Sequence, residues 1–169
     1  MRRLTLSLAL FAATIFGGLS LLAIKPAIAD SGEEAIKARR DFMGKEIYDH
    51  WKALAAYSKK GIGTLQDVEA HANALTSLSA KIPEHFPKDT GRGNYPDKMT
   101  RALPKIWENW EDFRKSAERL GEGSQRLAQA AKAGDKDMVV ELIGKSGSYG
   151  KTKIGCAECH EKYQGPKVK

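Results

Sequence analysis

The two cysteines of this 169-residue chain stand in one short phrase near the C-terminus, Cys156-Ala157-Glu158-Cys159-His160. In this spacing two thiols can form thioethers to the vinyl groups of a porphyrin, while the adjacent imidazole ligates the iron from the proximal side. The phrase therefore predicts one covalently attached haem c, bound through Cys156 and Cys159, with His160 as an iron ligand.

Two other chemistries use a pair of closely spaced cysteines. A zinc site would need a second pair of ligands, which no further cysteine in this chain can supply. A thioredoxin-like redox pair would follow a strand, whereas the residues around Cys156 have the pattern of a helix. Haem attachment is therefore the favoured interpretation.

The N-terminus has the pattern of a signal peptide. Met1-Arg2-Arg3 is positively charged, residues 4–24 are almost wholly apolar, and Ala27-Ile28-Ala29 is a small-x-small cleavage site. We expect residues 1–29 to be removed, which leaves residues 30–169 as one soluble domain in the periplasm. The apolar run is long enough for an uncleaved anchor helix, which stays open as an alternative.

The charge of the chain argues against one class of partner. The full chain has 28 basic and 21 acidic residues, and loss of Arg2, Arg3 and Lys25 with the signal leaves 25 minus 21, or +4. The basic residues are spread along helical faces without aromatic interleaving, so we expect no nucleic-acid partner. Redox partner proteins with an acidic surface remain compatible with this charge.

The first half of the mature chain predicts two helices. One covers residues 32–58 and is followed by two lysines and Gly61. The next begins at Thr64, where Thr64-x-x-Asp67 resembles a capping box, and ends at Pro83, after which residues 83–100 form a polar connection. Apolar residues recur at a spacing of three to four in both helices: Ile36, Met43, Ile47 and Leu54, then Leu65, Val68, Ala72, Leu75 and Ile82.

The second half predicts two more helices. The third opens with Pro104 in its first turn and continues to Gly134, and Asp135 caps the fourth, which passes through a run of small residues to the haem motif. No window shows the strict alternation of a strand. The expected fold is all-α, an antiparallel four-helix bundle with the covalent haem near the C-terminal helix.

The placement of the haem motif near the end of a four-helix chain, with Tyr163 three residues on, resembles the class II cytochromes c, the cytochrome c′ family. Two other stretches strengthen the resemblance, which covers essentially the whole mature chain. They are Leu103-Pro104-x-Ile106-Trp107-x-x-x-x-x-Phe113, similar to the third-helix signature of the family, and Ala35-Ile36-Lys37-x-Arg39-x-x-x-Met43, similar to the first.

The resemblance also bears on the distal side of the iron. In this family the position four residues after Arg39 points at the distal haem face; members with Leu or Phe there are five-coordinate and bind small gases, whereas members with Met there are low-spin. This chain has Met43. The resemblance therefore implies a one-electron carrier with iron between His160 and Met43, the low-spin Met/His-ligated branch, and implies that Arg39 meets a haem propionate.

The other methionines of the mature chain are poorer candidates for a ligand. Met138 precedes His160 by 22 residues, about 33 Å along a continuous helix, so it cannot reach the same haem unless that helix breaks in its Gly/Ser-rich middle. Met99 lies in the long connection, a poor place to hold a thioether rigidly.

Several alternatives stay open. Met43 could be a core residue that only fills the distal pocket, which would leave a five-coordinate cytochrome c′ that binds nitric oxide or carbon monoxide. His50 or His85 could ligate the iron instead.

Gln164 stands where the family often has a basic residue, four after His160. A peroxidase would need a vacant site with a distal His or Arg, and the chain offers no other catalytic constellation, so we expect no enzyme. The oligomeric state stays open, and a homodimer is one alternative.

Overall fold

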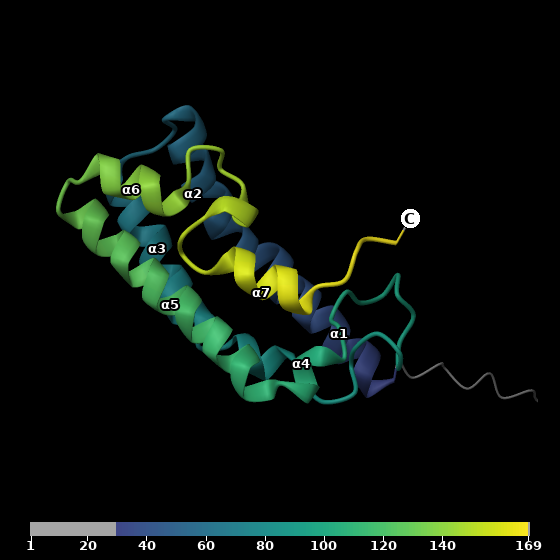
Figure 1. The fold of residues 1–169 in the computed structure, drawn as a ribbon. Helices are drawn as coiled ribbons and strands as arrows, with labels where there is room; N and C mark the ends of the chain where they lie inside the picture. Colours follow the sequence, from purple (N-terminus) through teal and green to yellow (C-terminus); the bar gives the residue numbers. More distant parts are fainter. Residues whose placement is uncertain (1–29, 169) are drawn as a thin grey trace, which may run out of the picture.

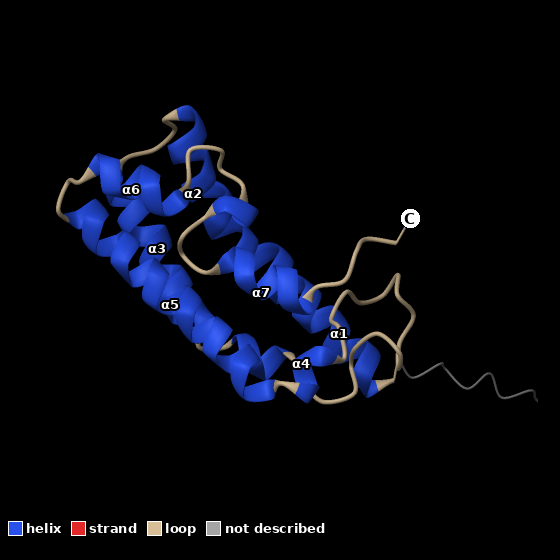
Figure 2. Ribbon diagram, in the orientation of Figure 1, coloured by secondary structure: helices blue, strands red, loops and turns tan. Residues whose placement is uncertain are grey.

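The computed structural model describes residues 30–168, so the predicted signal peptide lies outside the described residues. Within residues 30–168 the chain forms helices and loops and no strand beyond two isolated bridges (Figure 2). None of the helices in this part of the chain combines the length and apolar character that a membrane crossing requires. The prediction of an all-α fold is confirmed.

A π-helical segment interrupts the first predicted helix. The chain passes from α1 (Ser31–Asp41) through the π-helical segment Phe42–Ile47 into α2 (Tyr48–Lys60). A π turn contains one residue more than an α turn, so it changes which side chains face the core. The buried positions of this stretch are Ile36, Arg39, Phe42, Ile47, Trp51 and Leu54.

Phe42 therefore takes the core position that α-helical spacing gave to Met43. The Phe42 side chain is 3% exposed, whereas Met43 is partly buried and packs against the edge of the core. The predicted apolar stripe is wrong at Met43, because a period of 3.6 residues was extended through a π turn.

The turn between α2 and α3 (Leu65–Ser79) agrees with the sequence prediction. Gly61 ends α2 with a φ of 65°, a left-handed conformation that glycine adopts without strain. The Thr64 hydroxyl accepts a hydrogen bond from the Asp67 N–H (3.1 Å), and the Asp67 carboxylate accepts one from the Thr64 N–H (2.8 Å). This capping box satisfies two donors at the start of α3.

The third predicted helix is divided near its beginning. A short α4 (Lys105–Glu108) follows Pro104, and Asn109, with φ −127° and ψ 48°, separates it from the long α5 (Trp110–Lys132). Trp107 of α4 donates an indole hydrogen bond to the Phe86 carbonyl (3.0 Å), which fastens this first turn to the long connection.

The fourth predicted helix is divided more deeply. The Asp135 side chain caps α6 (Lys136–Ile143), as predicted, but α6 ends at Gly144, and α7 (Cys156–Tyr163) begins only after a loop. Gly144, Gly147 and Gly155 in or beside this loop have positive φ values of 88°, 57° and 105°. The predicted continuation of one helix into the haem motif is wrong, because these conformations end an α-helix.

The helices nevertheless form the predicted bundle. The four bundle members are α1 with α2, α3, α4 with α5, and α6 with α7; α5 packs along α3, and α7 lies against α5 (Figure 1). Structural relatives of the chain are four-helix bundles of the same kind, so the predicted architecture is confirmed. This packing brings the haem motif on α7 against the middle of the longest helix.

Candidate haem site

The two cysteines of the motif lie one turn apart on α7. Both side chains are partly buried and pack against the hydrophobic core. Burial raises the pKa of the Cys156 thiol to about 12 and that of the Cys159 thiol to about 11, so both sulfurs are uncharged at neutral pH. A thioether is likewise uncharged, so the conversion of these thiols to thioethers leaves no buried charge.

Two glycines allow α7 and the loop before it to approach α5 closely. A Cβ on Gly123 of α5 would lie 2.5 Å from the backbone of Ile154, and a Cβ on Gly155 would lie 3.0 Å from the backbone nitrogen of Leu120. Any larger residue at Gly123 would push the start of α7 away from the bundle. This contact could not be predicted from the sequence, because a glycine inside a helical pattern gives no sign of what lies against it.

The His160 imidazole is available as a ligand. Burial lowers the pKa of His160, and the positive charge of Arg101 lowers it further, so the ring is neutral at neutral pH, the state that binds metals. Its Nδ1 atom is buried and has no hydrogen-bond partner among the described residues. The Tyr149 ring lies edge-on to the imidazole, at a centroid distance of 4.9 Å.

The far end of α7 is fastened to the start of α5. The Asp112 carboxylate accepts hydrogen bonds from the Lys162 ammonium (2.6 Å) and the Tyr163 hydroxyl (2.5 Å). These two donors lower the pKa of Asp112 to about 2, so it is fully ionised at neutral pH. The Tyr163 ring is buried edge-on against Phe113, with a centroid distance of 5.4 Å. Together the contacts fix the helix that carries His160.

Arg39 is buried at the end of α1 and donates three hydrogen bonds to the long connection. One nitrogen bonds the Thr90 hydroxyl (2.9 Å), and another bonds both the Thr90 carbonyl (2.7 Å) and the Thr100 hydroxyl (2.8 Å). Burial lowers the pKa of Arg39 to about 10, which still leaves it charged at neutral pH. No carboxylate in residues 30–168 forms an ion pair with it.

The histidines considered as alternative iron ligands have other contacts. The His85 ring stacks on Phe42 at a centroid distance of 3.9 Å. The Nδ1 atom of His50 lies 2.9 Å from the Nδ1 atom of His71, on the neighbouring helix. Met138, the third candidate, is 42% exposed on α6. None of these contacts involves the haem motif.

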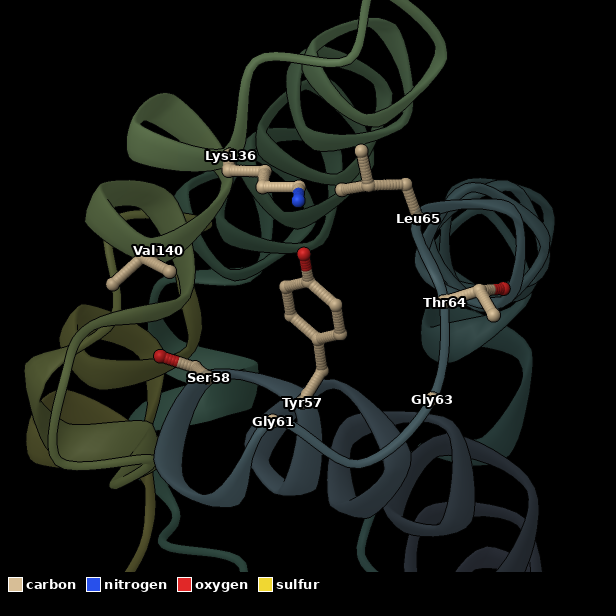
Figure 3. Close-up of a pocket in the computed structure, with 8 residues that line it drawn as sticks. All are labelled: Tyr57, Ser58, Gly61, Gly63, Thr64, Leu65, Lys136 and Val140. Atoms are coloured by element: carbon tan, nitrogen blue, oxygen red, sulfur yellow. The ribbon is translucent and has the colours of Figure 1, made fainter.

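The residues of the site fit a haem c. Two uncharged thiols and a neutral imidazole stand together on one helix. The buried Arg39 has no ion-pair partner within residues 30–168, and the propionates of a haem would supply that counter-charge. A cavity of about 630 Å³ lies elsewhere, between the α2–α3 turn and α6, with Tyr57 and Lys136 in its wall (Figure 3). That cavity contains none of the predicted site residues.

Comparison with known proteins agrees with this assignment. The sequence pattern of the family described as Cytochrome C′ matches residues 34–164. A cytochrome c′ of Pararhodospirillum photometricum is 28% identical over 79% of this chain and 98% of its own length. A cytochrome c-554 of Cereibacter sphaeroides is 30% identical over 78% of this chain and 93% of its own length.

A solved structure is also similar. A cytochrome c′ described as having an unusual ligand-controlled dimer dissociation superposes with a TM-score of 0.62 at 25% sequence identity. The match covers 81% of this chain and 98% of that chain. The similarity therefore includes the whole of the relative's bundle.

These relatives overturn the predicted function. In cytochromes c′ the iron is five-coordinate and binds nitric oxide or carbon monoxide. The prediction of a one-electron carrier with iron between His160 and Met43 is therefore wrong, and the low-spin branch is not supported. The chain itself offers a physical reason, since the π-helical segment buries Phe42 in the core and leaves Met43 at its edge.

The family match extends over most of the chain and includes both the motif on α7 and the first-helix residues around Arg39. The similarity in sequence and the similarity in fold lead to the same family. The chain belongs to the cytochrome c′ family, the class II cytochromes c, and carries a single covalently attached haem c.

Proposed function

We propose that this protein binds a small diatomic gas, nitric oxide or carbon monoxide, at a haem iron that His160 ligates from one side only. The bound haem supplies an iron centre with one open coordination position. The observation that carries the proposal is the π-helical segment, which places Phe42 in the core and turns Met43 to its edge. In this arrangement Met43 serves as part of the distal wall.

The surroundings of His160 bear on how strongly this imidazole would donate charge to the iron. A hydrogen-bond acceptor at the second ring nitrogen raises the basicity of an iron-ligating imidazole. His160 has no such acceptor among the described residues, because its buried Nδ1 is unpartnered. We infer that this imidazole donates charge only moderately to the iron.

Arg39 is proposed to balance the charge of the haem. Its guanidinium is buried, and its three hydrogen bonds all go to neutral oxygens of Thr90 and Thr100. An Arg side chain has five N–H donors, so donors remain for a propionate after these three bonds. The long connection would then hold Arg39 in position before the haem is attached.

We also propose a cellular location, a redox partner and an oligomeric state for this protein. The N-terminal pattern of residues 1–29 favours export to the periplasm. Carbon monoxide binds reduced iron, so we propose that a redox partner protein supplies the electron. A homodimer is proposed on the similarity to the cytochrome c′ with ligand-controlled dimer dissociation, and we expect the protein to bind gas without catalysing a reaction.

Optical spectra of the purified holoprotein test this proposal. We expect high-spin spectra in both oxidation states and binding of carbon monoxide by the reduced protein without prior loss of a ligand. Met43→Ala should remain high-spin and bind carbon monoxide faster, because it removes bulk from the distal wall. Met138→Ala, which changes an exposed methionine on α6, is the matched control and should behave as the wild type.

Two outcomes would contradict the proposal. One is a wild-type protein that is low-spin when oxidised and reduced. The other is a Met43→Ala variant that changes from low to high spin, since only the loss of an iron ligand produces that change.

A further inference from the structure

His50 of α2 and His71 of α3 form a pair between the two helices. Their Nδ1 atoms lie 2.9 Å apart, and the ring centroids are separated by 5.2 Å at an interplanar angle of 57°. Both side chains are partly exposed, so solvent ions reach them. Neither residue takes part in the haem site described above.

We propose that His50 and His71 form a binding site for a divalent transition-metal ion, with Cu(II) as the best-suited ion. In tetragonal coordination two adjacent imidazole nitrogens, each about 2.0–2.1 Å from the metal, lie about 2.8–3.0 Å apart. The observed separation of 2.9 Å is that of a hydrogen bond between the two rings, and it meets this requirement once both neutral rings carry their proton on Nε2. Rotation about the broad χ2 torsion of each histidine turns the two lone pairs toward one point.

The charges around the pair favour a cation. Asp49 lies beside His50, and Asp67 stands one turn before His71 on α3; each carboxylate is close enough to interact electrostatically with its histidine. Burial lowers the pKa of His50, and the charge of His71 lowers it further. His50 is therefore neutral at neutral pH, the state required for coordination.

The site would be open. No cluster of three or more His, Cys, Asp or Glu side chains suited to a metal occurs within residues 30–168, so the protein supplies two ligands and water completes the coordination. Two imidazoles with oxygen ligands suit Cu(II) best, because Cu(II) stands highest in affinity among the divalent first-row metals. Bound metal would link α2 to α3 close to the π-helical segment.

The test uses the holoprotein, treated with chelator and then titrated with CuCl2 alone. We expect one equivalent of Cu(II) per chain by calorimetry, and an electron paramagnetic resonance spectrum with nitrogen coupling, resolved from the haem signal. His50→Gln and His71→Gln should each weaken binding by at least about tenfold. His85→Gln, a histidine outside the pair, is the matched control and should retain wild-type affinity.

Each variant is first compared with the wild type by far-ultraviolet circular dichroism. His50 and His71 lie on different helices. If one of the two variants does not fold, the Cu(II) affinity of the other is enough for the test. Equal Cu(II) affinity in the wild type and in the folded variant would overturn the proposal, and so would a wild-type protein with no saturable binding.

Discussion

The guanidinium of Arg39 holds Thr90 at two points, donating one hydrogen bond to its hydroxyl (2.9 Å) and one to its carbonyl (2.7 Å). A further bond to Thr100 joins a second point of the long connection to α1. Arg39 also lies over the Phe86 ring, 4.8 Å from its centroid. A single buried side chain thus organises a segment that is mostly loop, and its planar guanidinium reaches all these partners.

We therefore expect Arg39→Lys to destabilise the holoprotein. An ammonium group cannot donate along the directions of a guanidinium fork, so buried oxygens of Thr90 or Thr100 lose their donors, at a cost of about 1–3 kcal/mol. Urea unfolding of the holoprotein measures the change. Arg40→Lys, at the exposed neighbouring position, is the control; equal stability of both variants would show that the hydrogen bonds of Arg39 contribute little.

Gly123→Ala should separate α7 from α5. The added methyl would lie 2.5 Å from the Ile154 backbone, and backbone cannot move aside as a side chain can. Overpacking of this kind costs about 1–3 kcal/mol. Gly44→Ala, whose Cβ meets nothing within 4 Å, is the matched control and should be neutral or slightly stabilising. Thermal unfolding monitored by circular dichroism gives both values, and two variants of equal stability would refute the close contact.

The features that the sequence predicted correctly depend on residues close together in the chain. The capping box of Thr64 and Asp67, the glycine cap at Gly61 and the cap at Asp135 are each complete within a few residues. The haem motif is local in the same sense. Short-range patterns of this kind specify their own geometry, so a single sequence is enough to find them.

The features that were missed depend on distant residues or on a change of helical period. The partners of Arg39 are 51 and 61 residues away, and His71 follows His50 by 21 residues. The π-helical segment has no clear mark in its sequence, yet it decides that Phe42 and not Met43 is buried. The prediction of Met43 on the buried stripe was wrong for that reason, since one residue of register separates the two assignments.

The contact of Asp112 with Lys162 and Tyr163 should make the free energy of unfolding depend on pH at acidic pH. The two donors lower the pKa of Asp112 from its ordinary 3.8 to about 2 in the folded protein. A carboxyl group whose pKa is lower in the folded protein stabilises the fold fully at any pH above its pKa in the unfolded chain. This contribution is lost as the pH falls through the pKa of the folded protein.

Asp112→Asn should therefore be less stable than the wild type at pH 6, with the difference shrinking between about pH 4 and pH 2. Denaturant midpoints of both holoproteins across this range measure it. Glu111→Gln, at an exposed neighbour that pairs with Arg114, is the control, and a wild-type advantage over Asp112→Asn that stays constant down to pH 2 would contradict the role of Asp112.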